Sequence, residues 1–224
     1  MPKRKLERFA ENKTFPHFFQ PYYYELLEGF PLKGKWNRDF FDNDHPIVLE
    51  LGCGKGEFTV GLAERFPEKN FIGMDVKGAR MWRGAKTSHD QAMKNVAFVR
   101  NKIQNINYIF DSQEVDEFWI TFPDPQPNKP RIRKRLTSPQ FLERYREIAN
   151  PGAIVHLKTD NAMFFEYTLG VVREQNLSLL FHTFDVDKNP GNQLVLSIRT
   201  FYEEMFRAKD IPIKYLKFRL FPGE

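Results

Sequence analysis

Three glycines and two carboxylates stand at spacings that suit the binding of a nucleoside-containing ligand. The glycines alternate in Glu50-Leu51-Gly52-Cys53-Gly54-Lys55-Gly56, directly after an apolar run. Glycine is needed where the main chain turns sharply and a ligand approaches it closely. Asp75 follows Gly54 by 21 residues, where nucleotide-binding α/β folds place a carboxylate on ribose hydroxyls. We therefore predict that Gly52, Gly54 and Asp75 bind a ligand. The alternative is a structural tight turn with an incidental acid.

Two details indicate which ligand this would be. The spacing is G-x-G-x-G rather than the G-x-G-x-x-G of NAD sites, and the triphosphate-binding pattern G-x-x-x-x-G-K-[ST] does not occur. Glu50 would repel a pyrophosphate but could accept a hydrogen bond from a cationic amino group. S-adenosylmethionine has a sulfonium, an ammonium and no phosphate, so we expect it as the cofactor. No base is placed beside Cys53, which we interpret as a small buried residue rather than a nucleophile.

Asp124 is the candidate catalytic residue. It lies in Phe122-Pro123-Asp124-Pro125, directly after another apolar run, and the two prolines restrict the backbone around it. Ligands of open α/β sheets bind beyond the carboxyl ends of the strands. We therefore expect Asp124 at the reaction centre.

A basic tract follows this loop at once. Residues 129–135 hold five Lys or Arg and no acid, which accounts for the whole net charge of +5. Phosphate contacts require such a concentration of cations, although a charge run is more often a solvated surface. Its position beside Asp124 favours nucleic acid as the partner. We expect four further cations to widen this surface: Lys158, Arg199, Lys214 and Lys217.

Together these motifs resemble the tRNA (guanine-N7-)-methyltransferases of the TrmB type, and the likeness covers most of the chain from about residue 47. It is carried by Glu50–Gly56, Phe122–Pro125, Arg131–Leu136, Leu157–Asp160 and Thr200–Glu203. The resemblance implies transfer of a methyl group from S-adenosylmethionine to N7 of a guanine in the tRNA variable loop (guanine 46), which forms 7-methylguanosine. The implied partner is tRNA.

The resemblance also assigns roles to individual residues. It places Glu50, Asp75, Asn101 and Lys102 on the cofactor and Asp124 at the catalytic position. The resemblance implies that Asp160, Thr200, Phe201, Tyr202 and Glu203 bind the substrate, with a further contact at Asn128 or Lys129. From the charge run we predict that Arg131, Arg133, Lys134 and Arg135 contact phosphates.

The sequence departs from the family pattern at three positions. Lys102 stands where the family usually has a carboxylate or amide, so the cofactor contact can shift to Asn101. Asn128 stands where a lysine is expected, and Lys129 can substitute for it. Gln126 replaces the usual aromatic residue.

Other functions remain open at this point. The chain could methylate another RNA or a protein, or it could be an RNA-binding protein whose methyltransferase fold has lost activity. A Rossmann dehydrogenase is a third possibility.

The elements that must position these residues alternate between strands and helices. Such alternation predicts an α/β fold, a Rossmann-like doubly wound sheet that is mostly parallel. We expect strands over 47–51, 70–74, 96–99, 115–121 and 153–157, and helices over 57–66, 78–93, 139–149 and 162–174. Strand-like runs over 178–184 and 194–200, joined by residues 187–192, predict an antiparallel hairpin at the end of the chain.

Residues 46–224 would form the methyltransferase domain and residues 1–45 a basic, aromatic N-terminal extension. The aromatic residues of the extension could stack on bases, but we favour their packing onto the domain. They are Phe15, Phe18, Phe19, Tyr22, Tyr23 and Tyr24.

Composition sets the remaining expectations. With one cysteine the chain cannot form a disulfide framework, and no apolar run approaches the roughly 18 residues of a membrane span. We expect a soluble, cytoplasmic protein with no membrane partner and no metal. The sequence leaves the oligomeric state open between a monomer and a homodimer.

Overall fold

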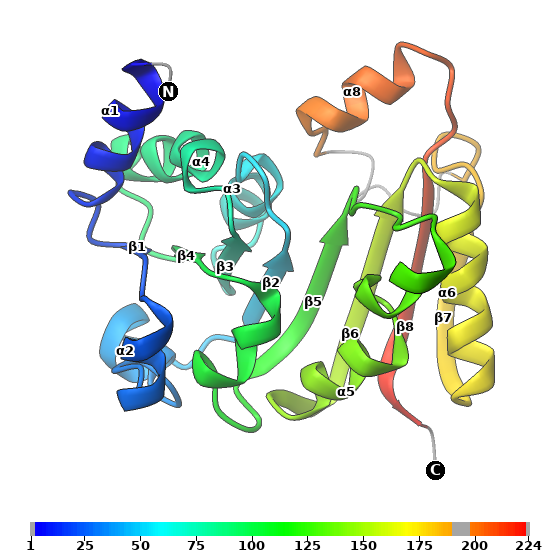
Figure 1. Ribbon diagram of the computed structural model, residues 1–224, viewed down its shortest axis with the longest axis horizontal. Helices are drawn as coiled ribbons and strands as arrows, with labels where there is room; N and C mark the ends of the chain where they lie inside the picture. The colour runs from blue at the N-terminus through cyan, green and yellow to red at the C-terminus, as the bar shows by residue number, and fades with distance from the viewer. Residues whose placement is uncertain (1–2, 190–197, 223–224) are drawn as a thin grey trace.

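A sheet of eight strands runs through the described residues, which are 3–189 and 198–222 (Figure 1). In this computed structural model the strand order is β1-β4-β3-β2-β5-β6-β8-β7. The strands are β1 Phe18–Phe19, β2 Ile47–Leu51, β3 Asn70–Asp75, β4 Val96–Arg100, β5 Val115–Thr121, β6 Ala149–Thr159, β7 Leu177–Thr183 and β8 Lys214–Pro222.

Helices connect most of the strands. The α-helices are α1 Lys3–Asn12, α2 Tyr23–Glu28, α3 Glu57–Arg65, α4 Gly78–Asp90, α5 Pro139–Arg146, α6 Ala162–Glu174 and α8 Phe201–Arg207. A π-helix, η1, spans Trp36–Phe41, and two 3₁₀-helices are η2 Ile103–Tyr108 and η3 Lys129–Lys134.

The sheet is mostly parallel, as predicted. The six strands from β1 to β6 in the sheet order all pair in parallel. β8 lies between β6 and β7 and is antiparallel to both. The α/β class, the parallel sheet and the antiparallel pairing at the C-terminal end are therefore confirmed.

The predicted hairpin paired residues 178–184 with residues 194–200, and the described residues of the second run show that this was wrong. Residues 198–200 form no strand, and residues 190–197 lie outside the described residues. β7 pairs instead with β8, and Thr200 is the N-cap of α8, where its hydroxyl accepts a hydrogen bond from the backbone N–H of Glu203 (3.2 Å). Several boundaries also moved. α4 ends at Asp90 and α5 at Arg146, each three residues before the predicted end, and β6 begins at Ala149, four residues before the predicted strand.

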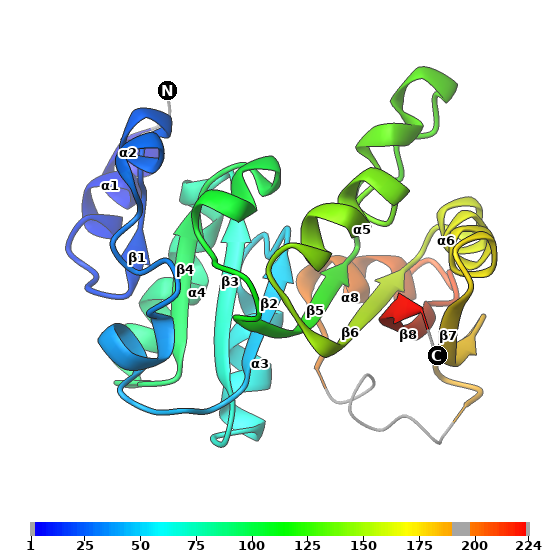
Figure 2. The same cartoon turned by 90° about the horizontal axis from the view of Figure 1, so that it is seen from below.

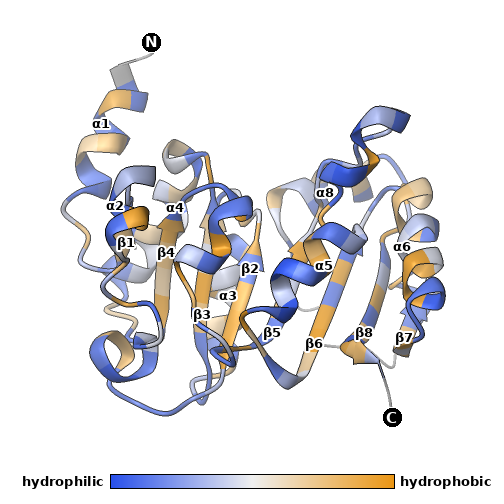
Figure 3. Cartoon of the chain, turned by 60° about the horizontal axis from the view of Figure 1, so that its bottom comes forward, coloured by the Kyte–Doolittle hydropathy of each residue, from blue (hydrophilic) through white to orange (hydrophobic). Residues whose placement is uncertain are grey.

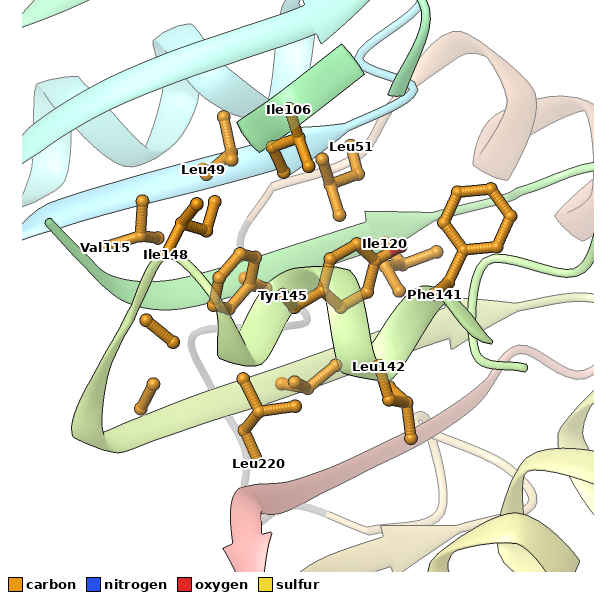
Figure 4. Packing of buried hydrophobic residues seen from close by; sticks show 14 of the residues in the cluster. Leu49, Leu51, Ile106, Val115, Ile120, Phe141, Leu142, Tyr145, Ile148 and Leu220 are labelled. Carbon is orange, nitrogen blue, oxygen red and sulfur yellow. The ribbon is translucent and has the colours of Figure 1, made fainter. Parts of the chain in front are cut away.

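Helices cover both faces of the sheet. Side chains that point to either side of a central strand are therefore buried, which explains the continuous apolar runs in the sequence. Leu49 of β2 packs in one layer with Phe141 and Tyr145 of α5 (Figure 4). Val48, which points to the other face, packs in the layer that contains residues of α3 and α4. Figure 3 shows hydrophobic residues along the central strands and hydrophilic residues on the outer surfaces of the helices. This arrangement leaves the strand ends, rather than the faces, for a binding site.

Residues 3–45 pack along the edge of the sheet. β1 pairs with β4, and Phe15 and Phe18 are buried in the α3–α4 layer. Tyr22, Tyr23 and Tyr24 are exposed. Phe19 packs against Trp36 in the other layer, with ring centroids 5.2 Å apart. The expected packing thus holds for the three phenylalanines, whereas the tyrosines stay exposed and Tyr23 makes an edge contact with the Tyr108 ring (5.9 Å). None of the described helices combines the length and the apolar character that a membrane crossing needs.

Candidate active site at the carboxyl edge of the sheet

The parallel strands bring the predicted residues to one edge of the sheet. Gly52, Asn101 and Asp160 directly follow β2, β4 and β6, Asp75 ends β3, and Asp124 lies three residues after β5. α8, which carries the predicted substrate segment, lies over the same edge, above the arrowheads of β5 and β6 in Figure 1. Carboxyl ends of neighbouring parallel strands are where open α/β sheets bind their ligands.

The glycine loop turns tightly over the end of β3. Gly52 and Gly54 have φ values of 83° and 56°, in the left-handed region that favours glycine. A Cβ on Gly52 would meet nothing within 4 Å, and one on Gly54 would meet only the Gly52 carbonyl oxygen at 4.0 Å. A Cβ on Gly56, in contrast, would lie 2.7 Å from the Phe98 ring. Gly56 is thus required by packing, whereas Gly52 and Gly54 present bare main chain to open space.

Asp75 is held against this loop by backbone donors. The N–H of Gly54 donates to Oδ2 (3.0 Å) and the N–H of Lys77 donates to Oδ1 (2.8 Å). Each carboxylate oxygen can accept more than one hydrogen bond. The partly exposed carboxylate can therefore still accept from a ribose diol.

Glu50 is buried at the end of β2, with 2% of its surface exposed. The Thr121 hydroxyl donates to Oε1 (2.6 Å) and the Thr59 hydroxyl donates to Oε2. Burial raises the pKa of Glu50 above its ordinary value, and the two hydroxyl donors oppose that rise. Thr59 and Thr121 were not predicted. A buried acid needs donors, and hydroxyl residues at the ends of the neighbouring elements are the signal that could have found them.

Cys53 is buried, as predicted, and burial raises the pKa of its thiol well above the ordinary value. A thiol in this state is a poor nucleophile.

Asn101 and Lys102 differ in how free their side chains are. The Asn101 amide nitrogen donates to the Pro21 carbonyl (2.9 Å), and its oxygen accepts from the Lys102 N–H (2.9 Å) and the Asn105 amide (2.7 Å). Lys102 is exposed, and in the described part of the chain its ammonium has no hydrogen bond or ion pair. Which of the two contacts the cofactor stays a prediction.

The loop that carries Asp124 has a strained backbone. Phe122 and Gln126 have φ values of 47° and 44°, which non-glycine residues seldom adopt. The Gln126 N–H donates to Asp124 Oδ1 (3.0 Å), and the Asp124 side chain is exposed at the edge. Strain of this kind gathers at functional sites, where the surrounding structure maintains it.

Arg135 is one of the groups that maintain the Asp124 loop. Its guanidinium donates from Nε to the Pro125 carbonyl (3.1 Å) and from Nη2 to the Gln126 carbonyl (3.3 Å), and it lies 4.3 Å from the centroid of the Tyr167 ring. Only 4% of Arg135 is exposed. The other predicted phosphate contacts, Arg131, Arg133 and Lys134, are exposed on η3, as is Lys129, and Asn128 is the N-cap of that helix.

The substrate segment forms the start of α8 and is bonded to α3 and to α4. The Phe201 N–H donates to Glu57 Oε2 (2.8 Å), and Arg80 donates to the Tyr202 hydroxyl (2.8 Å). Asp160 is half-buried beside α6, and burial raises the pKa of its carboxyl. The contacts of Phe201 and Tyr202 hold the start of α8 beside α3, which directly follows the glycine loop, and beside α4.

Glu203 is fully buried within the protein. Lys158 Nζ donates to its Oε2 (2.6 Å) and Arg207 Nε donates to its Oε1 (3.0 Å). Lys158 is 0% exposed, and Lys214 is also buried and donates to the Asp160 carbonyl (3.0 Å). The expectation that Lys158 and Lys214 widen an RNA-binding surface was therefore wrong. A Lys158–Glu203 pair could not be found from spacing, because 45 residues separate the partners.

No described group of three or more His, Cys, Asp or Glu side chains is arranged to hold a metal ion.

Comparison with known proteins identifies the family of this chain. A family model described as "Putative methyltransferase" matches residues 44–216. A protein of Christiangramia forsetii named tRNA (guanine-N(7)-)-methyltransferase is 49% identical over 220 residues, which are 97% of this chain and 98% of that protein. A protein of the same name from Cytophaga hutchinsonii is 41% identical over 224 residues, 99% and 100% of the two chains.

Among solved structures, the 16S rRNA methyltransferase KamB matches with a TM-score of 0.63 at 15% identity, covering 83% of this chain and 92% of that one. This likeness shows the fold. The sequence relatives show more: the chain belongs to the tRNA (guanine-N7-)-methyltransferase family.

Proposed function

We propose that the protein transfers a methyl group from S-adenosylmethionine to N7 of a guanine in the variable loop of tRNA. The observation that carries this proposal is the glycine loop, whose open main chain and two flanking carboxylates share one sheet edge with the exposed Asp124. The relatives named above supply the substrate and the position of the methyl group.

The residues of the loop fit this cofactor. Asp75 would accept from the ribose hydroxyls, and Gly52 and Gly54 would allow close approach of the main chain. Glu50 would stabilise the cationic amino-acid part, because the donors to its carboxylate in the described structure are neutral: the Thr59 and Thr121 hydroxyls and the Thr59 backbone N–H. Bound there, S-adenosylmethionine supplies an electrophilic methyl group on a sulfonium.

Guanine N7 needs no general base, because it carries an in-plane lone pair and is a hydrogen-bond acceptor at neutral pH. The protein therefore contributes mainly by aligning the nucleophile with the methyl group and sulfur. Methylation makes the guanine cationic, and a carboxylate nearby stabilises the charge that develops. We assign this role to Asp124, which would accept from the N–H edge of the base, with Asp160 beside it.

Arg135 and Glu203 act indirectly in this proposal. Arg135 positions the Asp124 loop through its two carbonyl contacts, and Glu203 positions the start of α8 through Lys158. Phosphate binding is left to the exposed cations Lys129, Arg131, Arg133 and Lys134.

The test is transfer of labelled methyl to unmodified tRNA, followed by nucleoside analysis. We expect label only in 7-methylguanosine, and loss of label when the variable-loop guanine is replaced by adenine. Label in another nucleoside or in protein would overturn the substrate. Calorimetric binding of S-adenosylmethionine without any transfer would indicate an inactive RNA-binding relative.

Asp124→Asn tests the catalytic assignment. Removing one group that stabilises a charged transition state typically slows the chemical step by about 10- to 1,000-fold. We expect a loss in this range in the single-turnover rate at saturating tRNA, with the affinity for S-adenosylmethionine retained. A wild-type rate would exclude Asp124 from the chemical step.

A further inference from the structure

A cationic channel lies between α1 and α4, outside the basic tract. Two hollows of about 580 Å³ and 450 Å³ form it, and both are lined by Arg8 and Arg80. Lys and Arg account for eight of the residues that line the two hollows, and Glu57 is the single acid among them. We call the two hollows together the α1–α4 channel.

The charges of the α1–α4 channel are largely uncompensated. Among the described residues, its eight cations make a single ion pair, between Lys55 and Glu57 at 4.0 Å. Arg4, Lys5 and Arg83 have no side-chain hydrogen bond or ion pair to any described residue. Concave walls of one sign concentrate the electrostatic field and attract an anionic partner.

Several guanidinium groups are already held in place by the protein. Arg8 lies 4.7 Å from the centroid of the Trp82 ring, and Arg100 lies 4.7 Å from that of Phe9. Arginine presents several donors in a planar fork that matches phosphate, and a restrained fork loses less conformational entropy on binding. The channel is thus prepared for phosphate groups.

The α1–α4 channel adjoins the candidate active site. Arg80 donates to the Tyr202 hydroxyl (2.8 Å), and Lys55 Nζ lies 3.4 Å from the centroid of the Phe201 ring. Both aromatic residues begin α8. Figure 2 shows α1 and η3 near opposite ends of the sheet, projecting to the same side of it. A polyanion that reaches the active site from η3 can therefore continue past α8 into the channel.

We propose that the α1–α4 channel binds the sugar–phosphate backbone of tRNA on the side of the target guanine opposite the basic tract. The inference rests on the proposed function for the identity of the RNA. It adds a second phosphate-binding surface, which makes the enzyme contact tRNA on both sides of the reacting base. Apart from Lys55, which belongs to the glycine loop, the channel cations lie outside both the charge run 129–135 and the family motifs.

The test compares two triple variants that each remove three positive charges. The channel variant is Arg4→Gln, Lys5→Gln, Arg83→Gln. The matched control is Lys35→Gln, Lys94→Gln, Arg173→Gln, three exposed cations outside the channel and the tract. The dissociation constant for tRNA is measured from 50 to 300 mM salt, and calorimetry with S-adenosylmethionine checks that each variant is folded.

We expect the channel variant to bind tRNA at least tenfold more weakly at low salt. The slope of log K against log salt should fall by roughly two to three, since each phosphate contact contributes about 0.7 to 0.9. A variant that keeps the charge, Arg4→Lys with Arg83→Lys, should retain the wild-type slope. The control should change the slope by less than one.

Equal slopes for the channel variant and the control would overturn this inference while leaving the proposed function intact. If wild-type protein binds tRNA with the expected slope but forms no 7-methylguanosine, the proposed function fails separately. Failure of wild-type protein to bind tRNA at all would refute both.

Discussion

At the scale of single residues, Gly52 and Gly54 show how a loop can be recognised as a ligand site. Both have positive φ, and neither has a neighbour that a methyl group would strike. Their positive φ explains why they are glycines, and the open space beside them leaves room for a ligand at the edge of the sheet. Gly56, only two residues on, is explained by its contact with Phe98.

Gly54→Ala should therefore affect cofactor binding more than folding. The left-handed conformation costs an L-residue about 1–2 kcal/mol, and the new methyl group would project into the space assigned to the cofactor. We expect about tenfold weaker binding of S-adenosylmethionine by calorimetry. Gly29→Ala is the matched control, because Gly29 also combines positive φ with open surroundings. Equal affinities in the two variants would contradict the assignment.

His156 provides a pH-dependent contribution to stability. It stacks on Trp119 with ring centroids 4.0 Å apart, its Nδ1 pairs with the Tyr215 hydroxyl (2.8 Å), and burial lowers its pKa to about 4. Between pH 6.5 and 4 the unfolded chain binds a proton that the folded chain does not. The stabilisation is thus present above pH 6.5 and is lost as the pH falls towards 4, by up to about 3 kcal/mol.

His156→Phe should remove this dependence. Urea unfolding at pH 7.5, 6 and 5 should show the wild-type protein losing more stability than the variant as the pH falls. Replacement of the exposed His182 by Phe serves as the control. Parallel curves for wild type and His156→Phe would show that His156 does not titrate as proposed.

At the scale of elements, a buried ion pair connects α8 to β6. Lys158 and Glu203 are both 0% exposed, and burial lowers the pKa of Lys158 while Glu203 opposes that shift. Removing one member of such a pair leaves a buried charge without its counter-ion, at a cost of about 3–5 kcal/mol. The pair therefore makes the position of α8, and of the substrate segment, depend on β6.

A double-mutant cycle tests this connection. Glu203→Leu and Lys158→Met should each lower the free energy of unfolding by about 3–5 kcal/mol, and the double variant should cost less than their sum, because Lys158 is then not left without its counter-ion and Arg207 keeps Asp187. Lys86→Met, which breaks an exposed pair with Asp90, should cost below about 1 kcal/mol. A double variant as unstable as the sum of its two single variants would show no coupling.

At the scale of the whole molecule, the positive charge occupies two separate surfaces beside one active site. The Lys and Arg side chains of the basic tract (residues 129–135) are exposed except for Arg135, which supports the Asp124 loop. Arg131→Gln, Arg133→Gln, Lys134→Gln should lower the salt slope for tRNA binding by roughly two to three. An unchanged slope, measured against the same Lys35, Lys94, Arg173 control, would reject the tract as a phosphate-binding surface.

Much of this protein could be read from local sequence. Apolar runs buried on both faces identified most strands, and five of the predicted site residues lie at one edge because parallel strands share their carboxyl ends. The start of α8 also had a local indication, because Thr200-x-x-Glu203 is a helix-capping pattern. We nevertheless predicted a strand there, because the run of residues before Thr200 is strand-like.

Tertiary structure alone decided which polar groups are available for binding. The sequence assigned the charges of Lys158, Arg135 and Glu203 to substrate binding, yet the fold buries all three. Lys158 and Glu203 pair with each other across 45 residues, and Glu203 also pairs with Arg207, four residues further on. Arg135 donates to carbonyl groups 9 and 10 residues before it. The α1–α4 channel arises in the same way, because its walls come from distant parts of the chain. The kind of fold and the family could be inferred from the amino-acid sequence, since they depend on periodicity and short motifs, and the same motifs predict the cofactor loop. Burial and long-range pairing depend on how elements pack, and only the packed chain shows which charges remain for RNA.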